Sequence, residues 1–375
     1  MGVIPVWGDP QDWANPEPLR GEAQADVCVV GLGGSGLAAV GALLEAGASV
    51  VGLDAGPVGG GAAGRNGGFL LAGGALFHHA AVEAWGQARA AGIYEESLTE
   101  IDRLAAELGD VVRRVGSLRT PADAEEAADC ARQREALERD GFPATELGGG
   151  VLVPSDGAID PLARCRLLAS RAAAAGARLH AATPATGITG GRVTTPEGAV
   201  ACRAVVVAVD GGLEHALPEL AGRVRSTRLQ MLATEPLAAT VAPRPVYHRW
   251  GYDYWQQLPD GRLALGGGRD RHAAAEWGAP AEPEEAVQAE LDRVLREDAG
   301  VDAQVTHRWA GVVAYTEDRL PVLETVRPGV IAVGAHSGHG NVLGSAAARA
   351  AAEIALGRPA GRLAGLLRPE HWAQA

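Results

Sequence analysis

Three glycines at a fixed spacing are the first residues in this sequence whose types point to chemistry. Gly31, Gly33 and Gly36 form the pattern G-x-G-x-x-G directly after a β-branched run at 26–30. In this pattern the first glycine permits a tight turn, the second lets a diphosphate approach the backbone, and the third lets helix and strand pack closely. The start of the following helix offers its unpaired N–H groups and positive dipole end to that anion. The pattern therefore indicates a dinucleotide site.

An acidic residue completes the unit that must position these glycines. A helix is expected over 37–46, and Gly47 ends it. A second buried strand over 49–53 then leads to Asp54. A carboxylate at this place accepts hydrogen bonds from the ribose hydroxyls of the adenosine and disfavours a phosphorylated ribose. The unit as a whole therefore favours FAD or NAD over NADP.

The composition excludes several other kinds of chemistry. All 33 basic residues of the 375-residue chain are arginine, so a Schiff-base lysine and a Walker A loop are both excluded. The net charge of −13 opposes nucleic-acid binding, which depends on clustered cations. The four cysteines have no paired spacing, so no disulfide framework is expected. No metal site is expected either, because His78, His79 and His272 lack partners at ligand spacing and are interpreted as solvent-facing or loop residues.

A long glycine loop and a second glycine motif favour a flavin over a nicotinamide. The stretch 55–69 reads Ala-Gly-Pro-Val-Gly-Gly-Gly-Ala-Ala-Gly-Arg-Asn-Gly-Gly-Phe, which a nicotinamide-binding unit does not need after its second strand. Further on, a strand over 330–334 leads into Ala-His-Ser-Gly-His-Gly-Asn at 335–341, and a helix is expected over 342–356. Together these motifs resemble the FAD-dependent amine and amino-acid oxidoreductases of the D-amino-acid-oxidase type. That family includes glycine oxidase, sarcosine oxidase and γ-glutamylputrescine oxidase.

The resemblance implies non-covalent FAD and assigns residues to it. In the family, the loop matching 64–68 binds the flavin, and the loop matching 338–342 faces the pyrimidine end of the isoalloxazine. Two residues depart from the family pattern, namely Asp54 in place of the usual glutamate and Asp210 in place of glycine or asparagine. The residues expected to bind FAD are Gly31, Gly33, Gly34, Ser35, Gly36, Asp54, Ala55, Gly64, Arg65, Asn66, Gly67, Gly68, Ala185, Gly338, His339, Gly340, Asn341 and Val342.

The same resemblance implies a discontinuous fold of the α/β class. We expect a Rossmann-type FAD-binding domain with an interleaved α+β substrate domain built on a mixed, largely antiparallel sheet. Helical periodicity over 83–108 and 122–139, and strand-like runs between 228 and 265, fit the substrate domain. The expected bounds are 22–73, 151–212 and 301–360 for the FAD-binding domain, 74–150 and 213–300 for the substrate or cap domain, and 1–21 for an N-terminal extension.

Aromatic and polar side chains are the candidates for contact with a substrate. Tyr252, Tyr254 and Trp255 are expected in the wall of the pocket, with Asn66 and His336 near the flavin. Each of the three aromatic residues is equally well explained by packing within a half-buried sheet. His336 either orients or deprotonates an amine, or is a hydrogen-bonded structural histidine.

The cations that hold a substrate carboxylate in the relatives are missing at the matching positions. Val313 and Gly338 match carboxylate-binding arginines, Val342 matches a carboxylate-binding lysine, and Ala264 matches the oxygen-activating lysine of sarcosine oxidase. Val313 also matches the cysteine that binds the flavin covalently. A buried carboxylate without a cation is costly, so an amine or a modified amino acid is favoured over an ordinary amino acid. The alternatives for a rearranged clamp are Arg65, Arg269 and Arg271.

The sequence thus predicts an FAD-dependent amine or amino-acid oxidase. Hydride would pass from the carbon beside the nitrogen to flavin N5, giving an imine, with O2 as acceptor and H2O2 as product. The alternatives are a dehydrogenase that reduces a quinone or protein carrier, an NAD-dependent dehydrogenase and a non-catalytic flavin redox sensor. The N-terminus lacks the pattern of a secretory signal, and glycines interrupt the uncharged stretch 27–44, so a cytoplasmic protein without a membrane span is expected. No oligomeric state is predicted.

Overall fold

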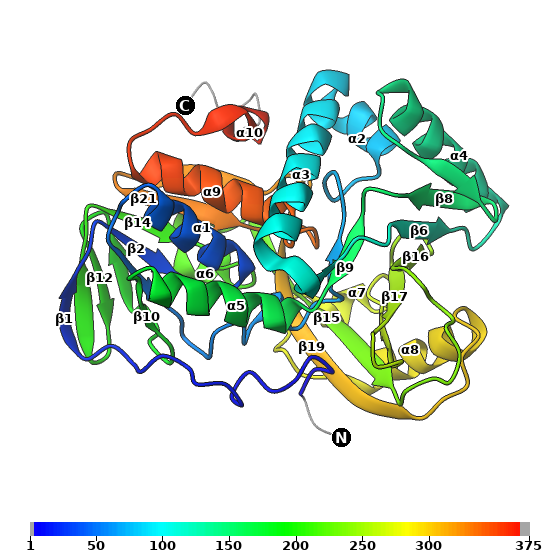
Figure 1. Cartoon of the computed structure of the whole chain (residues 1–375), viewed down its shortest axis with the longest axis horizontal. Coiled ribbons are helices and arrows are strands. Elements are labelled where there is room, and N and C mark those ends of the chain that lie inside the picture. The colour runs from blue at the N-terminus through cyan, green and yellow to red at the C-terminus, as the bar shows by residue number, and fades with distance from the viewer. Residues whose placement is uncertain (1–3, 368–375) are drawn as a thin grey trace. The chain divides into compact units, whose positions relative to one another are not determined.

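The chain divides into two compact units, each assembled from separate segments of the sequence. A computed structural model describes residues 4–367 (Figure 1). We call one unit the parallel-sheet unit; its described residues are Asp9–Gly64, Pro161–Ser226 and 313–367. The described residues of the other, the large-sheet unit, are 4–8, Arg65–Asp160 and Thr227–Val312. The units divide at 64, 160, 226 and 312, whereas the boundaries expected from the sequence are at 73, 150, 212 and 300.

The parallel-sheet unit is built on a six-stranded sheet of order β10-β3-β2-β14-β21-β20. The first five strands run parallel and β20 pairs antiparallel to β21. The central strands are buried along their whole length, because helices cover them, as expected for uninterrupted apolar runs. Their bounds are Arg178–His180 (β10), Val50–Leu53 (β3), Val27–Val30 (β2), Ala204–Val207 (β14), Val330–Gly334 (β21) and Val322–Arg327 (β20).

Three helices of this unit carry the segments that matter for a ligand. They are α1 (Gly34–Glu45), α5 (Pro161–Ala174) and α9 (Leu343–Ala355), and α1 packs against both α5 and α9 (Figure 1). Pro161 begins α5, where its fixed φ and missing N–H suit the first position of a helix. The remaining elements are the sheet β1-β13-β12-β11 (Gly21–Gln24, Gly198–Ala201, Arg192–Thr195, Gly187–Thr189) and the short helices η1 (Ala62–Gly64), α6 (Leu213–Ala216), η3 (Pro218–Leu220) and α10 (Gly361–Leu366).

The large-sheet unit is built on an eight-stranded mixed sheet of order β19-β15-β18-β17-β16-β6-β8-β7. A smaller sheet, β4-β9-β5, accompanies it. The bounds are Val305–Thr316 (β19), Val224–Thr234 (β15), Leu263–Gly266 (β18), Asp253–Gln257 (β17), Val246–His248 (β16), Ser117–Thr120 (β6), Gly150–Val153 (β8), Thr145–Leu147 (β7), Phe69–Leu70 (β4), Gly157–Ile159 (β9) and Val112–Arg113 (β5). Its helices are α2 (His78–Trp85), α3 (Gln87–Leu108), η2 (Gly109–Val111), α4 (Ala124–Arg139), α7 (Ala273–Glu276) and α8 (Glu285–Glu297).

The two faces of this sheet bury different side chains. Side chains alternate between faces along a strand, so Trp255 of β17 points opposite to its neighbours Tyr254 and Gln256. Trp255 packs in an apolar core with Leu291 and other residues of α8. Tyr254 packs instead against a second cluster that contains Trp309. Tyr254 and Trp255 therefore lie on opposite faces of the sheet and belong to different apolar clusters.

Two expectations about the first helical region need correction. The segment 83–108 is not one helix: Gly86, with a φ of 82°, separates α2 from α3. His78 and His79 lie on α2, and they are not solvent-facing, because they contact Asp140 and Asp129 at 2.7 and 2.8 Å. The sequence gives no sign of these partners, which are 62 and 50 residues away.

Candidate functional site

The glycine turn after β2 has the geometry that a diphosphate needs. Gly31 has a φ of 101°, and a Cβ on it would lie 2.7 Å from the carbonyl oxygen of Ala208. A Cβ on Gly36 would lie 1.8 Å from the carbonyl oxygen of Gly31, so helix α1 approaches the turn too closely for any side chain. Gly33 is the N-cap of α1 and supplies no side chain to bond the first N–H groups of the helix. These N–H groups remain available to an anion.

Asp54 shapes the same turn with its carboxylate. Its Oδ2 accepts the N–H of Leu32 at 2.7 Å and its Oδ1 accepts the N–H of Gly56 at 2.9 Å. Burial raises the pKa of this carboxyl, and the two backbone hydrogen bonds act in the opposite direction. Each carboxylate oxygen keeps a further acceptor site for a ribose hydroxyl. Ala185, another residue expected to bind FAD, lies in the loop between β10 and β11. It packs against an apolar core of this unit.

The loop between β21 and α9 is held in an unusual backbone conformation. Ala335 and Ser337 both have a φ of 51°, a left-handed conformation that non-glycine residues rarely adopt. Such conformations persist where surrounding contacts impose them, and they concentrate at binding sites. Here Asp210 imposes them, since its carboxylate accepts the N–H of His336 at 2.9 Å and the N–H of Ala314 at 3.1 Å. The departure from the family pattern at position 210 therefore has a structural use.

His336 lies inside this loop and faces the glycine turn. It is buried, and its Nε2 is 3.1 Å from the hydroxyl oxygen of Ser35 in α1. A Cβ on Gly344 would lie 2.8 Å from the same Nε2, so α9 also needs a glycine at this contact. Burial lowers the pKa of His336, although Asp210 opposes this effect, so the imidazole is neutral at pH 7. A buried, neutral and hydrogen-bonded imidazole is what a structural role for His336 requires. A residue that deprotonates an amine would need a higher pKa.

His339 completes the loop as a second neutral histidine. Burial lowers its pKa to about 4. The Nδ1 atoms of His336 and His339 are buried and have no hydrogen-bond partner among residues 4–367. Buried polar atoms in this state normally have a partner, so both mark a place where a polar ligand atom fits. Gly340 packs against the His336 ring, and Val342 is the N-cap of α9.

A buried arginine that the sequence analysis did not single out lies beside this loop. Arg164 of α5 is 1% exposed. Its guanidinium donates to Asn341 Oδ1 at 3.3 Å and to the Ser345 hydroxyl. A charged side chain on a surface helix is normally expected to face solvent, which is why the sequence alone did not reveal it.

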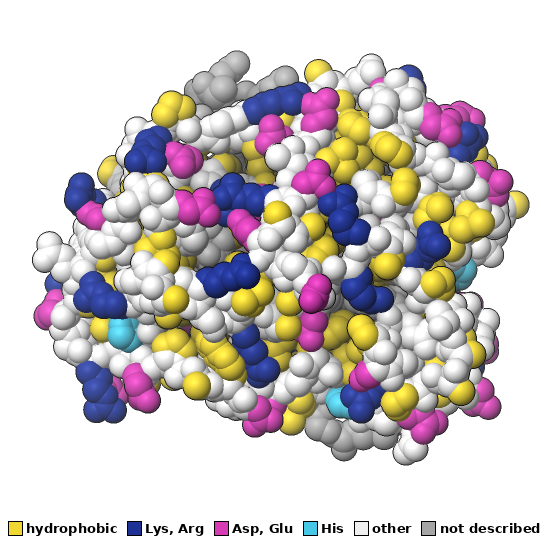
Figure 2. Space-filling model, in the orientation of Figure 1, with side chains coloured by type: hydrophobic (Ala, Val, Ile, Leu, Met, Phe, Trp, Pro, Cys, Tyr) yellow, Lys and Arg dark blue, Asp and Glu magenta, His cyan; other side chains and the backbone are white. Residues whose placement is uncertain are grey.

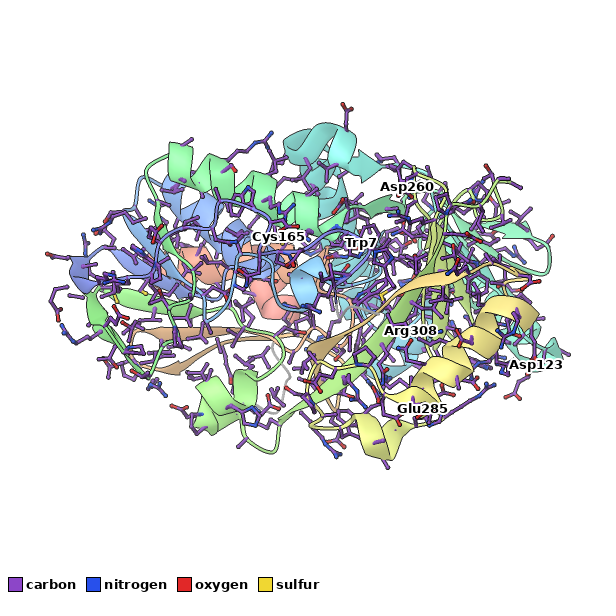
Figure 3. The ribbon with its side chains drawn as sticks, turned by 90° about the horizontal axis from the view of Figure 1, so that it is seen from below. Trp7, Asp123, Cys165, Asp260, Glu285 and Arg308 are labelled. Carbon is purple, nitrogen blue, oxygen red and sulfur yellow. The ribbon has the colours of Figure 1, made fainter. Side chains whose placement is uncertain are left out.

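In the large-sheet unit, the Arg65–Gly68 loop is fixed by hydrogen bonds to its backbone. The indole of Trp309 donates to Arg65 O at 2.7 Å, and the indole of Trp7 donates to Asn66 O at 3.0 Å. Asn66 Oδ1 accepts the N–H of Gly68 at 2.8 Å. Gly68 has a φ of 70°, and a Cβ on it would lie 2.3 Å from Ile159 O. Trp7, labelled in Figure 3, and Trp309 are therefore positioning residues that the sequence analysis missed.

The three predicted wall residues have three different environments. The ring of Tyr254 lies against the loop, 3.1 Å from the Cβ position of Gly67, and contacts the ring edges of Phe69 and Tyr247. Tyr252 precedes β17 in a turn and is 39% exposed. Trp255 is buried in the core on the opposite face. The structure therefore places Tyr254 beside Gly67, the residue that follows Asn66, and places Trp255 on the opposite face of the sheet.

The three arginines considered for a carboxylate clamp all have contacts of their own. Arg65 donates to Ala310 O at 3.3 Å, and Arg271 forms an ion pair with Glu290. The Arg269 guanidinium lies 5.8 Å from the centre of the Tyr252 ring. A fourth, Arg113, donates to Gln256 Oε1 at 2.7 Å, and Gln256 in turn donates to Gly67 O. Each arginine thus already binds protein groups.

Within residues 4–367, no group of three or more His, Cys, Asp or Glu side chains is arranged to hold a metal ion. None of the helices in that part of the chain is both long and apolar enough to cross a membrane. On the face drawn in Figure 2, arginine and acidic side chains are interspersed.

Comparison with known proteins decides the family. The family model described as "FAD dependent oxidoreductase" (DAO) matches residues 26–354. The chain belongs to this family. The glycine cradle at α1 and the two orphaned histidine nitrogens fit FAD, so the protein is an FAD-dependent oxidoreductase. The predicted family, fold class and cofactor are confirmed.

Relatives and solved structures cover nearly the whole chain. A probable oxidoreductase OrdL of Rhizobium meliloti is 29% identical over 369 residues, which is 91% of this chain and 85% of the relative. The γ-glutamylputrescine oxidoreductase of Escherichia coli is 29% identical over 373 residues, 91% of this chain and 86% of the relative. A crystal structure of glycine oxidase from Geobacillus kaustophilus has a TM-score of 0.77 at 21% identity, covering 93% of this chain and 99% of that chain.

Proposed function

We propose that this flavoprotein oxidises a carbon–nitrogen bond of an amine or a modified amino acid to an imine. In the overall reaction the substrate would lose a hydride from carbon and a proton from nitrogen, and O2 would take up the two electrons and two protons to give H2O2. Relatives with the same fold are named for such donors, including the γ-glutamylputrescine oxidoreductase and an iminodiacetate oxidase from Chelativorans sp. BNC1 with a TM-score of 0.72. The cofactor supplies the hydride acceptor.

The observation that carries the substrate class is the character of the Tyr254 face. It offers aromatic rings and an amide side chain, namely Tyr254, Phe69 and Gln256, while the nearby Arg113 and Arg65 donate to protein oxygens. Such a surface suits an amine, because aromatic faces attract the cation on approach and an apolar site lowers the pKa of a buried amine. An unprotonated amine is the form from which hydride can leave.

The parallel-sheet unit would contribute electrostatic stabilisation and not a base. His336 and His339 both have lowered pKa values, so neither is a good proton acceptor at pH 7. The start of α9 has unpaired N–H groups and the positive end of the helix dipole. These groups would stabilise the negative charge that develops on a flavin as it is reduced.

A panel of substrates tests this proposal. The holoprotein is mixed without oxygen with polyamines, N-methyl amino acids, cyclic amines and free D- and L-amino acids, and loss of the flavin absorbance is followed. We expect bleaching by amines or N-substituted amino acids. Y254F should raise KM for the best substrate more than Y252F does, because only Tyr254 lies against the Gly67 loop. Bleaching by free amino acids alone would contradict the substrate class.

A dehydrogenase that uses a quinone or protein carrier is the second candidate. Ala264 stands where sarcosine oxidase has its oxygen-activating lysine; it is buried in β18 opposite Gln256. No lysine occurs anywhere in the sequence. Mixing the reduced protein with oxygen separates the two candidates. Re-oxidation no faster than that of free reduced flavin would favour the dehydrogenase.

A further inference from the structure

Arg164 is a full positive charge placed inside the parallel-sheet unit. It lies on α5 next to Cys165, which Figure 3 labels, and it is 1% exposed. Its guanidinium donates to Asn341 Oδ1 and the Ser345 hydroxyl. Asn341 precedes α9, and Ser345 lies in the first turn of that helix. The side chain therefore connects α5 to the start of α9.

The same guanidinium also lies against the start of α1. A Cβ on Gly34, the first residue of α1, would be 3.1 Å from Cζ and from Nη1 of Arg164. A side chain at this position would be in tight contact with the guanidinium, which would have to shift by a few tenths of an ångström. One cation is thus in contact with the beginnings of two helices, and the described first turns of α1 and α9 contain no acidic residue.

This arrangement concentrates positive charge. Each helix start carries about half an elementary charge of positive sign, and Arg164 adds a whole one. Charges of the same sign repel strongly in a buried environment, so the cluster is unfavourable unless an anion is bound close to it. The diphosphate of FAD, which the glycine turn receives at the start of α1, is an anion of the required kind.

We propose that Arg164 is a buried counter-cation for the FAD diphosphate and positions the starts of α1 and α9 around it. The side chain acts from beneath the helix starts, so its contribution is additional to that of the glycine backbone. This role of Arg164 depends on its charge, so it can be distinguished experimentally from a role in packing alone. Removing the charge of Arg164 should weaken the binding of ligands that contain the diphosphate. It should leave the binding of ligands that lack the diphosphate unchanged.

The test compares three ligands on the apoprotein of each variant. FAD, ADP and adenosine are titrated into wild type, R164Q and R164K, and dissociation constants are measured by calorimetry. R164Q keeps hydrogen-bonding capacity without the charge, and R164K keeps the charge. We expect R164Q to weaken FAD and ADP by roughly tenfold or more, as for a lost charge-assisted contact. Adenosine should bind unchanged, and R164K should lose much less than R164Q.

Arg166 provides a matched control on the same helix. Its guanidinium donates to Asp9 O at 2.6 Å, away from the starts of α1 and α9. R166Q should leave the affinities for all three ligands unchanged. The proposal is overturned if R164Q binds FAD and ADP as tightly as wild type, if adenosine weakens in equal measure, or if R166Q reproduces the effect. Wild-type binding of FAD in the same titration tests the cofactor assignment separately.

Discussion

At the scale of single residues, Asp210 holds the loop before α9 in its strained form. Its two carboxylate oxygens each accept one backbone N–H, from His336 and Ala314. Two left-handed residues in that loop, Ala335 and Ser337, would otherwise relax. The loop carries His336 and His339, whose buried Nδ1 atoms have no hydrogen-bond partner among residues 4–367. A substitution at position 210 should therefore change the affinity for FAD.

Replacing Asp210 by alanine should lower both stability and FAD affinity. Two buried N–H groups would lose their acceptor, at a cost of roughly 1–3 kcal/mol each. D210N keeps one acceptor oxygen and should lie between wild type and D210A. Urea unfolding and FAD titration measure the two effects. D318A is the control, since Asp318 accepts the N–H of Leu320, two residues along the chain; equal losses in D318A and D210A would refute the role of Asp210.

The buried histidine His339 predicts a pH dependence of stability. Its pKa in the folded protein is about 4, below the ordinary value of 6.5, because it is buried. Between these two pH values the unfolded chain binds more protons at this residue than the folded protein does. The contribution of His339 to folding stability is therefore complete above pH 6.5 and is lost as the pH falls toward 4. The difference corresponds to about 3 kcal/mol. Unfolding free energies at pH 7.5 and 5 should differ less in H339N than in wild type, whereas H272N should behave as wild type.

At the scale of elements, much of the parallel-sheet unit could be predicted from the sequence. The strand over 330–334 and the glycine turn follow from local rules, because apolar runs covered on both faces and glycines at contact points leave few alternatives. Other features depend on tertiary contacts. Trp255 faces one side of the sheet because α8 covers that side. Arg164 is buried because α1 and α9, which are distant in sequence, pack against it. Neither has a local signal.

Helix α1 offers a direct test of the close approach at the glycine turn. A Cβ on Gly36 would collide with Gly31 O, whereas a Cβ on Gly41 meets nothing within 4 Å. G36A should therefore abolish FAD binding or folding. G41A, in the interior of the same helix, should stabilise the protein by about 0.5–1 kcal/mol through helix propensity. Thermal unfolding with and without FAD checks both, and a tolerated G36A would contradict the packing described for α1.

At the scale of the whole molecule, the family match over residues 26–354 includes segments of both units. The parallel-sheet unit supplies a cradle of glycines, helix starts and neutral histidines, which fits an anionic cofactor. The large-sheet unit supplies an aromatic face whose neighbouring arginines already bind protein oxygens. The protein is therefore a flavoprotein for which we propose a preference for amines.

The most direct measurement is a single-turnover reduction of the bound flavin without oxygen. An amine that bleaches the flavin is compared with the same amine deuterated at the carbon beside nitrogen. The account predicts one imine, or its carbonyl hydrolysis product, per FAD reduced, and a reduction rate several-fold slower for the deuterated amine. Failure of every amine to reduce the flavin, or reduction in which the carbon keeps its deuterium, would contradict oxidation of the carbon–nitrogen bond.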